Sequence, residues 1–86
     1  MYSVELSQTA AKFLEKLDIN ISNRIKEKLK TLAANPVPSD SKFITRENND
    51  KVFRIRMGDY RALYKLKEPE KIVLISKIDK RPRVYG

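Results

Sequence analysis

The chain has 86 residues, which is enough for one modest core, so we expect a single domain over residues 1–86. It contains no cysteine and no histidine. Disulfide bonds, thiolate or imidazole metal sites and histidine-dependent catalysis are therefore excluded. No apolar run approaches the roughly 20 residues of a membrane span, and the N-terminus is unlike a signal peptide. We expect a soluble, cytoplasmic protein.

The net charge of +8 is concentrated in the C-terminal part of the chain. Residues 51–86 carry a net charge of +7, against +1 for residues 1–50. The hydrophobic content of 41% indicates a folded core, so the charge belongs to a structured surface. Such a surface is typical of proteins that bind polyanions. The alternative is the lysine- and glutamate-rich surface common in hyperthermophilic proteins.

The N-terminal half predicts a strand followed by two helices. Residues 2–6 alternate between apolar and polar side chains, and Ser7 is a candidate helix cap. Two helical stripes follow, separated by Asp18 or Asn20 as the second cap. The second helix is expected to end at Asn35-Pro36, because a residue before proline avoids the helical region. The stripes consist of Ala10, Phe13, Leu14 and Leu17, and of Ile21, Ile25, Leu29 and Leu32.

The C-terminal half predicts strands joined by short turns. Turn residues occupy positions 47–50, 58–59 and 67–70, and Gly58-Asp59 is typical of a two-residue hairpin. The weak alternation of the last strand predicts a central strand that is covered on both faces. We expect an α+β fold, with an N-terminal strand and a two-helix hairpin packed on an antiparallel-dominated sheet of four to five strands. The later strands are expected at residues 42–46, 52–57, 60–66 and 72–78.

The hairpin turn at Gly58-Asp59 determines which side chains share a face. Its register places Arg56 opposite Arg61, with Arg54 on the same face. The other face is apolar and should meet the helices; it holds Phe53, Ile55, Met57, Tyr60, Ala62 and Tyr64. Opposed like charges cost about 0.2–1 kcal/mol, and no acidic side chain of the hairpin points to the arginines. Arginines without carboxylates suit phosphate binding, and the alternative is a solvated stripe or one paired with a distant acid.

The C-terminal tail is expected to reach the same place. The last strand runs back toward the hairpin turn, so the residues from Asp79 onward should emerge beside the arginines. Arg81, Arg83 and Tyr85 would then join the cluster. The alternatives are that Tyr85 packs on the sheet edge and that Arg83 is simply exposed to solvent.

Two segments resemble the RelE/ParE toxin superfamily. Residues 52–64 follow its central pattern of an aromatic residue, basic–apolar–basic, a turn and Tyr-Arg-x-x-Tyr. Residues 80–85, Lys-Arg-Pro-Arg-Val-Tyr, are similar to its C-terminal signature, often His-Arg-x-x-Val-Tyr. With the N-terminal strand and helices, the resemblance covers nearly the whole chain. Its length and lysine and arginine content are most similar to archaeal RelE proteins.

The resemblance implies a toxin of a type II toxin–antitoxin pair, neutralised by a RelB-like antitoxin protein. RelE-type members enter the ribosomal A site and cut the messenger RNA there. By position, the catalytic residues would be Arg61, Arg81 and Tyr85. Lys80 stands where many relatives have histidine, which matters only if that histidine transfers a proton. The RNA-binding residues would be Arg54, Arg56, Lys80 and Arg83.

The composition also restricts the chemistry of such a nuclease. The C-terminal half has four carboxylates, two of them beside Pro69, so we expect neither a metal nor another cofactor. The remaining route is attack by the RNA 2′-OH on the adjacent phosphate, with Arg61 and Arg81 binding that phosphate. Tyr85 is the candidate base; nearby guanidinium groups would lower its pKa from an ordinary value of about 10. Alternatively, Tyr85 stacks on a nucleobase.

Other function classes stay open at this point. A ParE-like toxin of the same fold would inhibit DNA gyrase through protein contacts and have no nuclease chemistry. A non-catalytic nucleic-acid-binding module would show salt-dependent binding without cleavage. The basic and tyrosine residues of the implied site, taken together, favour the ribonuclease branch.

Overall fold

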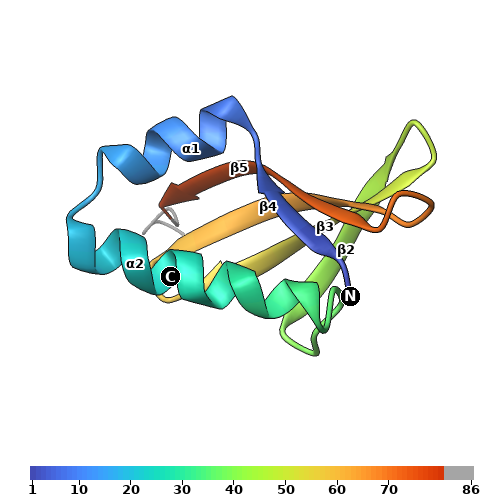
Figure 1. Cartoon of the computed structure of the whole chain (residues 1–86), viewed down its shortest axis with the longest axis horizontal. Helices are drawn as coiled ribbons and strands as arrows, with labels where there is room; N and C mark the ends of the chain where they lie inside the picture. The colour runs from blue at the N-terminus through green and yellow to red at the C-terminus, as the bar shows by residue number, and fades with distance from the viewer. Residues whose placement is uncertain (81–86) are drawn as a thin grey trace.

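The computed structural model describes residues 1–80 (Figure 1). In this part of the chain, five strands form one sheet in the order β1-β5-β4-β3-β2. The pairing of β1 with β5 is parallel, and the other pairings are antiparallel. The expected α+β fold is confirmed. The elements are β1 (Ser3–Leu6), α1 (Gln8–Glu15), α2 (Ile19–Lys30), the short 3-10 helix η1 (Thr31–Ala33), β2 (Ser41–Glu47), β3 (Asp50–Met57), β4 (Tyr60–Lys67) and β5 (Ile72–Lys80).

Both helices begin at side-chain caps. The Ser7 hydroxyl accepts a hydrogen bond from the Ala10 backbone N–H at 3.1 Å, as predicted. Asp18, one of the two candidates, caps α2 by accepting from the Asn20 N–H at 2.9 Å. Neither helix is long and apolar enough to cross a membrane, in the part of the chain that the structure describes.

The core lies between the helices and one face of the sheet. The predicted apolar face of the hairpin is confirmed: Ile55, Ala62 and Tyr64 are fully buried, and Met57 and Tyr60 pack against the core while staying partly exposed. Among residues 1–80, no helix covers the opposite face of the hairpin, so its charged side chains are at least partly exposed, although Val52 on that face is buried. The helices contribute Ala10, Leu14, Ile25 and Leu29 to this core.

The prediction that the last strand is covered on both faces is wrong. Val73, Ile75 and Ile78 are buried toward the helices, whereas Lys77 is exposed. A β-bulge at Ser76 explains the pattern, because Tyr64 pairs with Ile75 and Leu63 with Lys77. The extra residue reverses the alternation, so apolar side chains three positions apart face the same core.

Tyr64 ties the core to the segment that leads into β2. Its hydroxyl donates a hydrogen bond to the Pro36 carbonyl at 2.9 Å, and burial raises the pKa of Tyr64 above its ordinary value of 10.0. Tyr64→Phe is expected to lower the free energy of unfolding by about 1 kcal/mol. Urea denaturation at pH 7 measures this, with the partly buried Tyr60→Phe as a control of smaller effect.

The raised pKa of Tyr64 also predicts a pH dependence. A tyrosine that ionises less readily in the folded state stabilises the protein fully below pH 10 and loses this contribution as the pH rises further. The wild type should therefore lose stability above pH 10 more steeply than Tyr64→Phe. If the free energy of unfolding falls with pH equally steeply in the two proteins between pH 9 and 11, this prediction is wrong.

Candidate nucleic-acid interface

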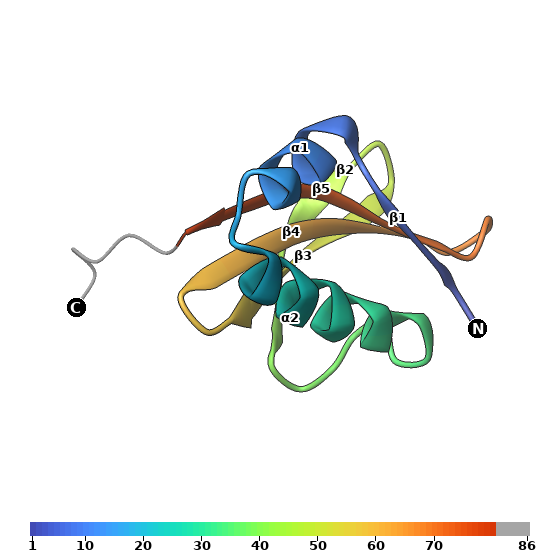
Figure 2. The same ribbon diagram turned by 60° about the vertical axis from the view of Figure 1, so that its left-hand side comes forward.

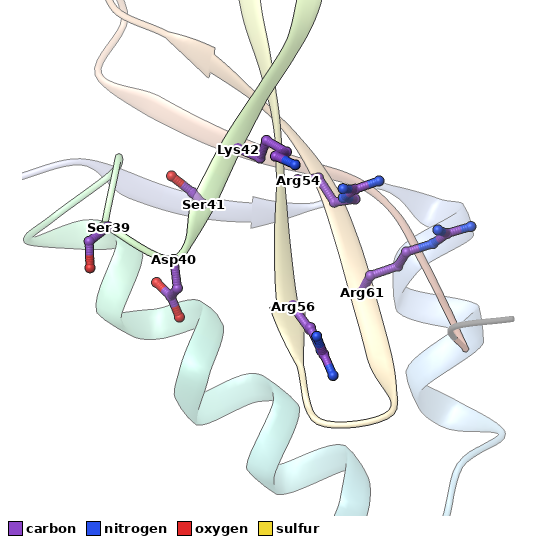
Figure 3. A pocket seen from close by; sticks show the side chains of 7 residues that line it. All are labelled: Ser39, Asp40, Ser41, Lys42, Arg54, Arg56 and Arg61. Atoms are coloured by element: carbon purple, nitrogen blue, oxygen red, sulfur yellow. The ribbon is translucent and has the colours of Figure 1, made fainter. Parts of the chain in front are cut away.

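The β3–β4 hairpin has the register expected from its two-residue turn. Gly58 supplies a backbone φ of +64°, which other residues rarely adopt. Arg56 pairs with Arg61, and Arg54 pairs with Leu63. The three arginines therefore share the face that lies away from the helices (Figure 3).

Strand β2 adds a fourth cation that the sequence analysis did not identify. Lys42 pairs directly with Arg54. A β-bulge at Ile44 produces this register, because Phe43 pairs with Phe53 and Thr45 with Val52. We call the four cations Lys42, Arg54, Arg56 and Arg61 the basic cluster. With Ser39, Asp40 and Ser41, they line a pocket of about 580 Å³ (Figure 3).

Charge is unevenly distributed over the sheet face that lies away from the helices, which we call the outer face. Away from the Gly58 turn, cations pair one to one with carboxylates: Lys65 with Glu47 at 2.9 Å and Lys67 with Asp50 at 3.1 Å. Near the turn, Lys42, Arg54 and Arg56 form no salt bridge with any residue from 1 to 80. The positive potential is therefore concentrated at one end of the face.

The expectation of a cluster free of carboxylates is wrong for Arg61. Its Nε donates a hydrogen bond to Asp79 Oδ1 at 3.0 Å, and Asp79 Oδ2 also lies 3.7 Å from Lys77 Nζ. The acid comes from β5, where Asp79 pairs directly with Arg61 across the ladder. The hairpin supplies no acid beside the arginines, because Asp50, its acid on this face, pairs with Lys67 at the end away from the Gly58 turn.

Asp40 borders the pocket but is held by α2. Lys28 Nζ donates to Asp40 Oδ2 at 2.9 Å, and this hydrogen bond keeps the pKa of Asp40 below its usual range. Within residues 1–80, acidic side chains do not gather in groups of three that suit a metal ion. The lysine and arginine N–H groups of the basic cluster therefore suit an anionic ligand better than a metal cation.

The end of β5 lies beside the hairpin turn, as expected (Figure 2). Lys80 pairs with Tyr60, however, and Tyr60 belongs to the face that meets the helices. The side chain of Lys80 thus lies on the opposite face of the sheet from the basic cluster, and the structure does not bring them together. Arg81, Arg83 and Tyr85 lie outside the described residues.

Comparison with known proteins places the chain in a family. A model described as the ParE toxin of the type II toxin–antitoxin system parDE matches residues 4–85. The chain belongs to the RelE/ParE toxins. Over 85 residues it is 32% identical to the "Putative toxin RelE1" of Methanocaldococcus jannaschii, a match that covers 98% of this chain and 94% of that protein. The chain is therefore a type II toxin of the RelE family, and the predicted resemblance is confirmed.

Solved structures of RelE proteins share this fold. The toxin superposes on RelE in the archaeal RelE–RelB complex of Pyrococcus horikoshii with a TM-score of 0.84 and 28% identity, over 95% of this chain and 97% of that one. For the RelBE2 complex of Mycobacterium tuberculosis the TM-score is 0.78 with 30% identity, over 93% and 98% of the chains.

Proposed function

We propose that this toxin is an endoribonuclease that cleaves messenger RNA in the ribosomal A site without a metal ion, and so acts in the cytoplasm. The observation that carries the proposal is the excess of positive charge at the Gly58 end of the outer face. Guanidinium groups bind phosphate oxygens through two parallel hydrogen bonds, so clustered arginines fit an RNA backbone. The names of the RelE relatives support the assignment as a toxin of this family.

The proposed reaction is an attack of the RNA 2′-oxygen on the adjacent phosphorus. The new bond forms a 2′,3′-cyclic phosphate, the bond to the 5′-oxygen breaks, and that oxygen leaves with a proton as a 5′-hydroxyl. Arg61 and Arg81 bind the phosphate as negative charge develops, and Arg54 and Arg56 hold the flanking backbone. Tyr85 either accepts the 2′-OH proton or stacks on a base, in which case water accepts that proton; water also supplies the proton that the 5′-oxygen takes up.

A RelB-like antitoxin is the proposed protein partner. The similar structures from Pyrococcus horikoshii and Mycobacterium tuberculosis were both solved as toxin–antitoxin complexes. An antitoxin that neutralises this protein must either bring carboxylates to the basic cluster or block the access of RNA to it.

The proposal is tested by adding purified toxin to a translating extract and mapping the new 5′ ends on the message. We expect ends inside codons that occupy the A site, carrying 5′-hydroxyl groups that must be phosphorylated before ligation. The same message without ribosomes should be cut far more slowly, because this chain has no histidine to assist the proton transfers. Intact message on translating ribosomes would refute the nuclease assignment.

Gyrase inhibition is the second candidate, because the matching family model describes the ParE toxin. A supercoiling assay with DNA gyrase distinguishes the two functions. Inhibited supercoiling together with intact message would assign the toxin to the ParE branch. Salt-dependent RNA binding with neither effect would instead indicate a non-catalytic binding module.

A further inference from the structure

Asp79 joins the basic cluster to the neighbouring strand β5. The Arg61 and Asp79 side chains are 30% and 34% exposed, so the pair lies at the surface rather than in the core. A second pocket, of about 220 Å³, is bordered by this pair together with Arg54 and Lys77. An RNA backbone that reaches the basic cluster would therefore meet the ion pair itself.

The ion pair contributes little to the stability of the fold. Partly exposed pairs of this kind add little to the free energy of folding, because water screens them and both side chains lose freedom. Strands β4 and β5 are already paired from Tyr60 to Lys67. The larger effect of Asp79 is on the direction in which the Arg61 side chain extends.

Repulsion from Arg56 and attraction to Asp79 both direct the Arg61 side chain toward β5. Arg56 is its direct partner on β3, and two guanidinium groups at paired positions repel each other. The hydrogen bond from Nε to Asp79 holds Arg61 toward β5, and in Figure 3 its side chain extends away from Arg56. The space between Arg61 and Arg54 stays open on the outer face.

The contact with Asp79 uses only one of the five N–H groups of Arg61. The bond runs from Nε, and the two terminal nitrogens make no hydrogen bond with any residue from 1 to 80. Those two nitrogens form the end of the guanidinium fork, which can donate to two phosphate oxygens at once. Asp79 thus fixes Arg61 while leaving its phosphate-binding edge available.

We propose that Asp79 is a positioning residue, which holds Arg61 by Nε and presents the two terminal nitrogens to the RNA phosphate that is cleaved. This inference rests on the proposed nuclease function. The carboxylate then has two effects of opposite sign: it orients Arg61, which speeds cleavage, and it repels RNA, which weakens binding. Removing Asp79 should separate them.

The kinetic test is single-turnover cleavage of message on ribosomes at saturating toxin. Asp79→Ala should slow cleavage about tenfold through misplacement of Arg61, while a filter assay shows tighter binding of a single-stranded RNA. Asp79→Asn keeps an acceptor oxygen in place and should recover most of the rate. If Asp79→Ala cleaves as fast as the wild type, or faster, the carboxylate only competes with RNA and the proposal fails.

Glu47→Ala is the matched control for the loss of one negative charge. Glu47 pairs with Lys65, four residues away from Arg61 along β4. Its removal should tighten RNA binding to a similar extent but leave the cleavage rate unchanged. A tenfold loss of rate in Glu47→Ala as well would show that overall charge, rather than the orientation of Arg61, controls the reaction.

Arginine side-chain NMR tests the positioning independently of cleavage. The Arg61 Nε–H signal should be protected from exchange in the wild type and Asp79→Asn, and lost in Asp79→Ala. It should persist when a single-stranded RNA is added. Loss of the signal on RNA binding would mean that RNA displaces Asp79, which overturns the proposal. Should the wild type leave message intact, the nuclease function fails, and this signal alone decides whether Asp79 positions Arg61 for phosphate.

Discussion

Arg61→Ala is expected to slow cleavage of ribosome-bound message by about 10²–10³-fold, the usual loss when one donor to a developing negative charge is removed. Among the described residues, Arg61 alone in the basic cluster is held by a fixed hydrogen bond, to Asp79 at 3.0 Å. Its guanidinium can therefore bind the phosphate in the transition state without first losing side-chain freedom. Single-turnover cleavage at saturating toxin measures the effect.

Lys65→Ala is the control for Arg61→Ala. Lys65 lies on the same strand and the same face, it is also paired with one carboxylate, and its removal changes the net charge equally. We expect its cleavage rate to stay within about threefold of the wild type, since exposed pairs contribute little. Equal losses in the two variants would contradict a specific role for Arg61.

Ile55→Ala should produce the largest loss of stability, about 2–5 kcal/mol in urea denaturation. Ile55 lies on β3 of the hairpin that carries the arginines, and its fully buried side chain faces the helices. Because a domain of this size is stable by only about 5–15 kcal/mol, much of the protein could unfold at 37 °C.

Ile44→Ala is the matched control for Ile55→Ala. Ile44 is 43% exposed on the outermost strand β2, so the same truncation leaves no enclosed cavity. Its effect on the free energy of unfolding should be below about 1 kcal/mol. A similar loss in both variants would mean that the outer face also belongs to the cooperative core.

Local chemistry allowed much of the fold to be predicted. The caps at Ser7 and Asp18 and the turn at Gly58-Asp59 are short-range signals. The length of the turn sets the β3–β4 register. Because side chains alternate along each strand, that register then decides which of them share a face. The opposition of Arg56 and Arg61 follows from that register alone. These features needed no knowledge of the other strands.

The two β-bulges were not predictable, and each of them changes the site. Without the bulge at Ile44, Lys42 would pair with Ile55 on the core face instead of joining Arg54. Without the bulge at Ser76, Asp79 would pair with Tyr60, away from Arg61. A bulge depends on how neighbouring strands twist and pack, which no short sequence pattern encodes. The missed Lys42 and the unexpected carboxylate share this origin.

The segment from Pro36 to Ser41 forms one wall of the larger pocket and is fastened at several points. Tyr64 donates to the Pro36 carbonyl, Lys28 holds Asp40, and the Ser41 hydroxyl donates to the Pro38 carbonyl at 2.7 Å. A wall tied to the core and to a helix is pre-organised, so an incoming strand need not order it. When RNA binds at this wall, the protein should therefore lose little conformational entropy. We expect most of the conformational change on binding to occur in the RNA.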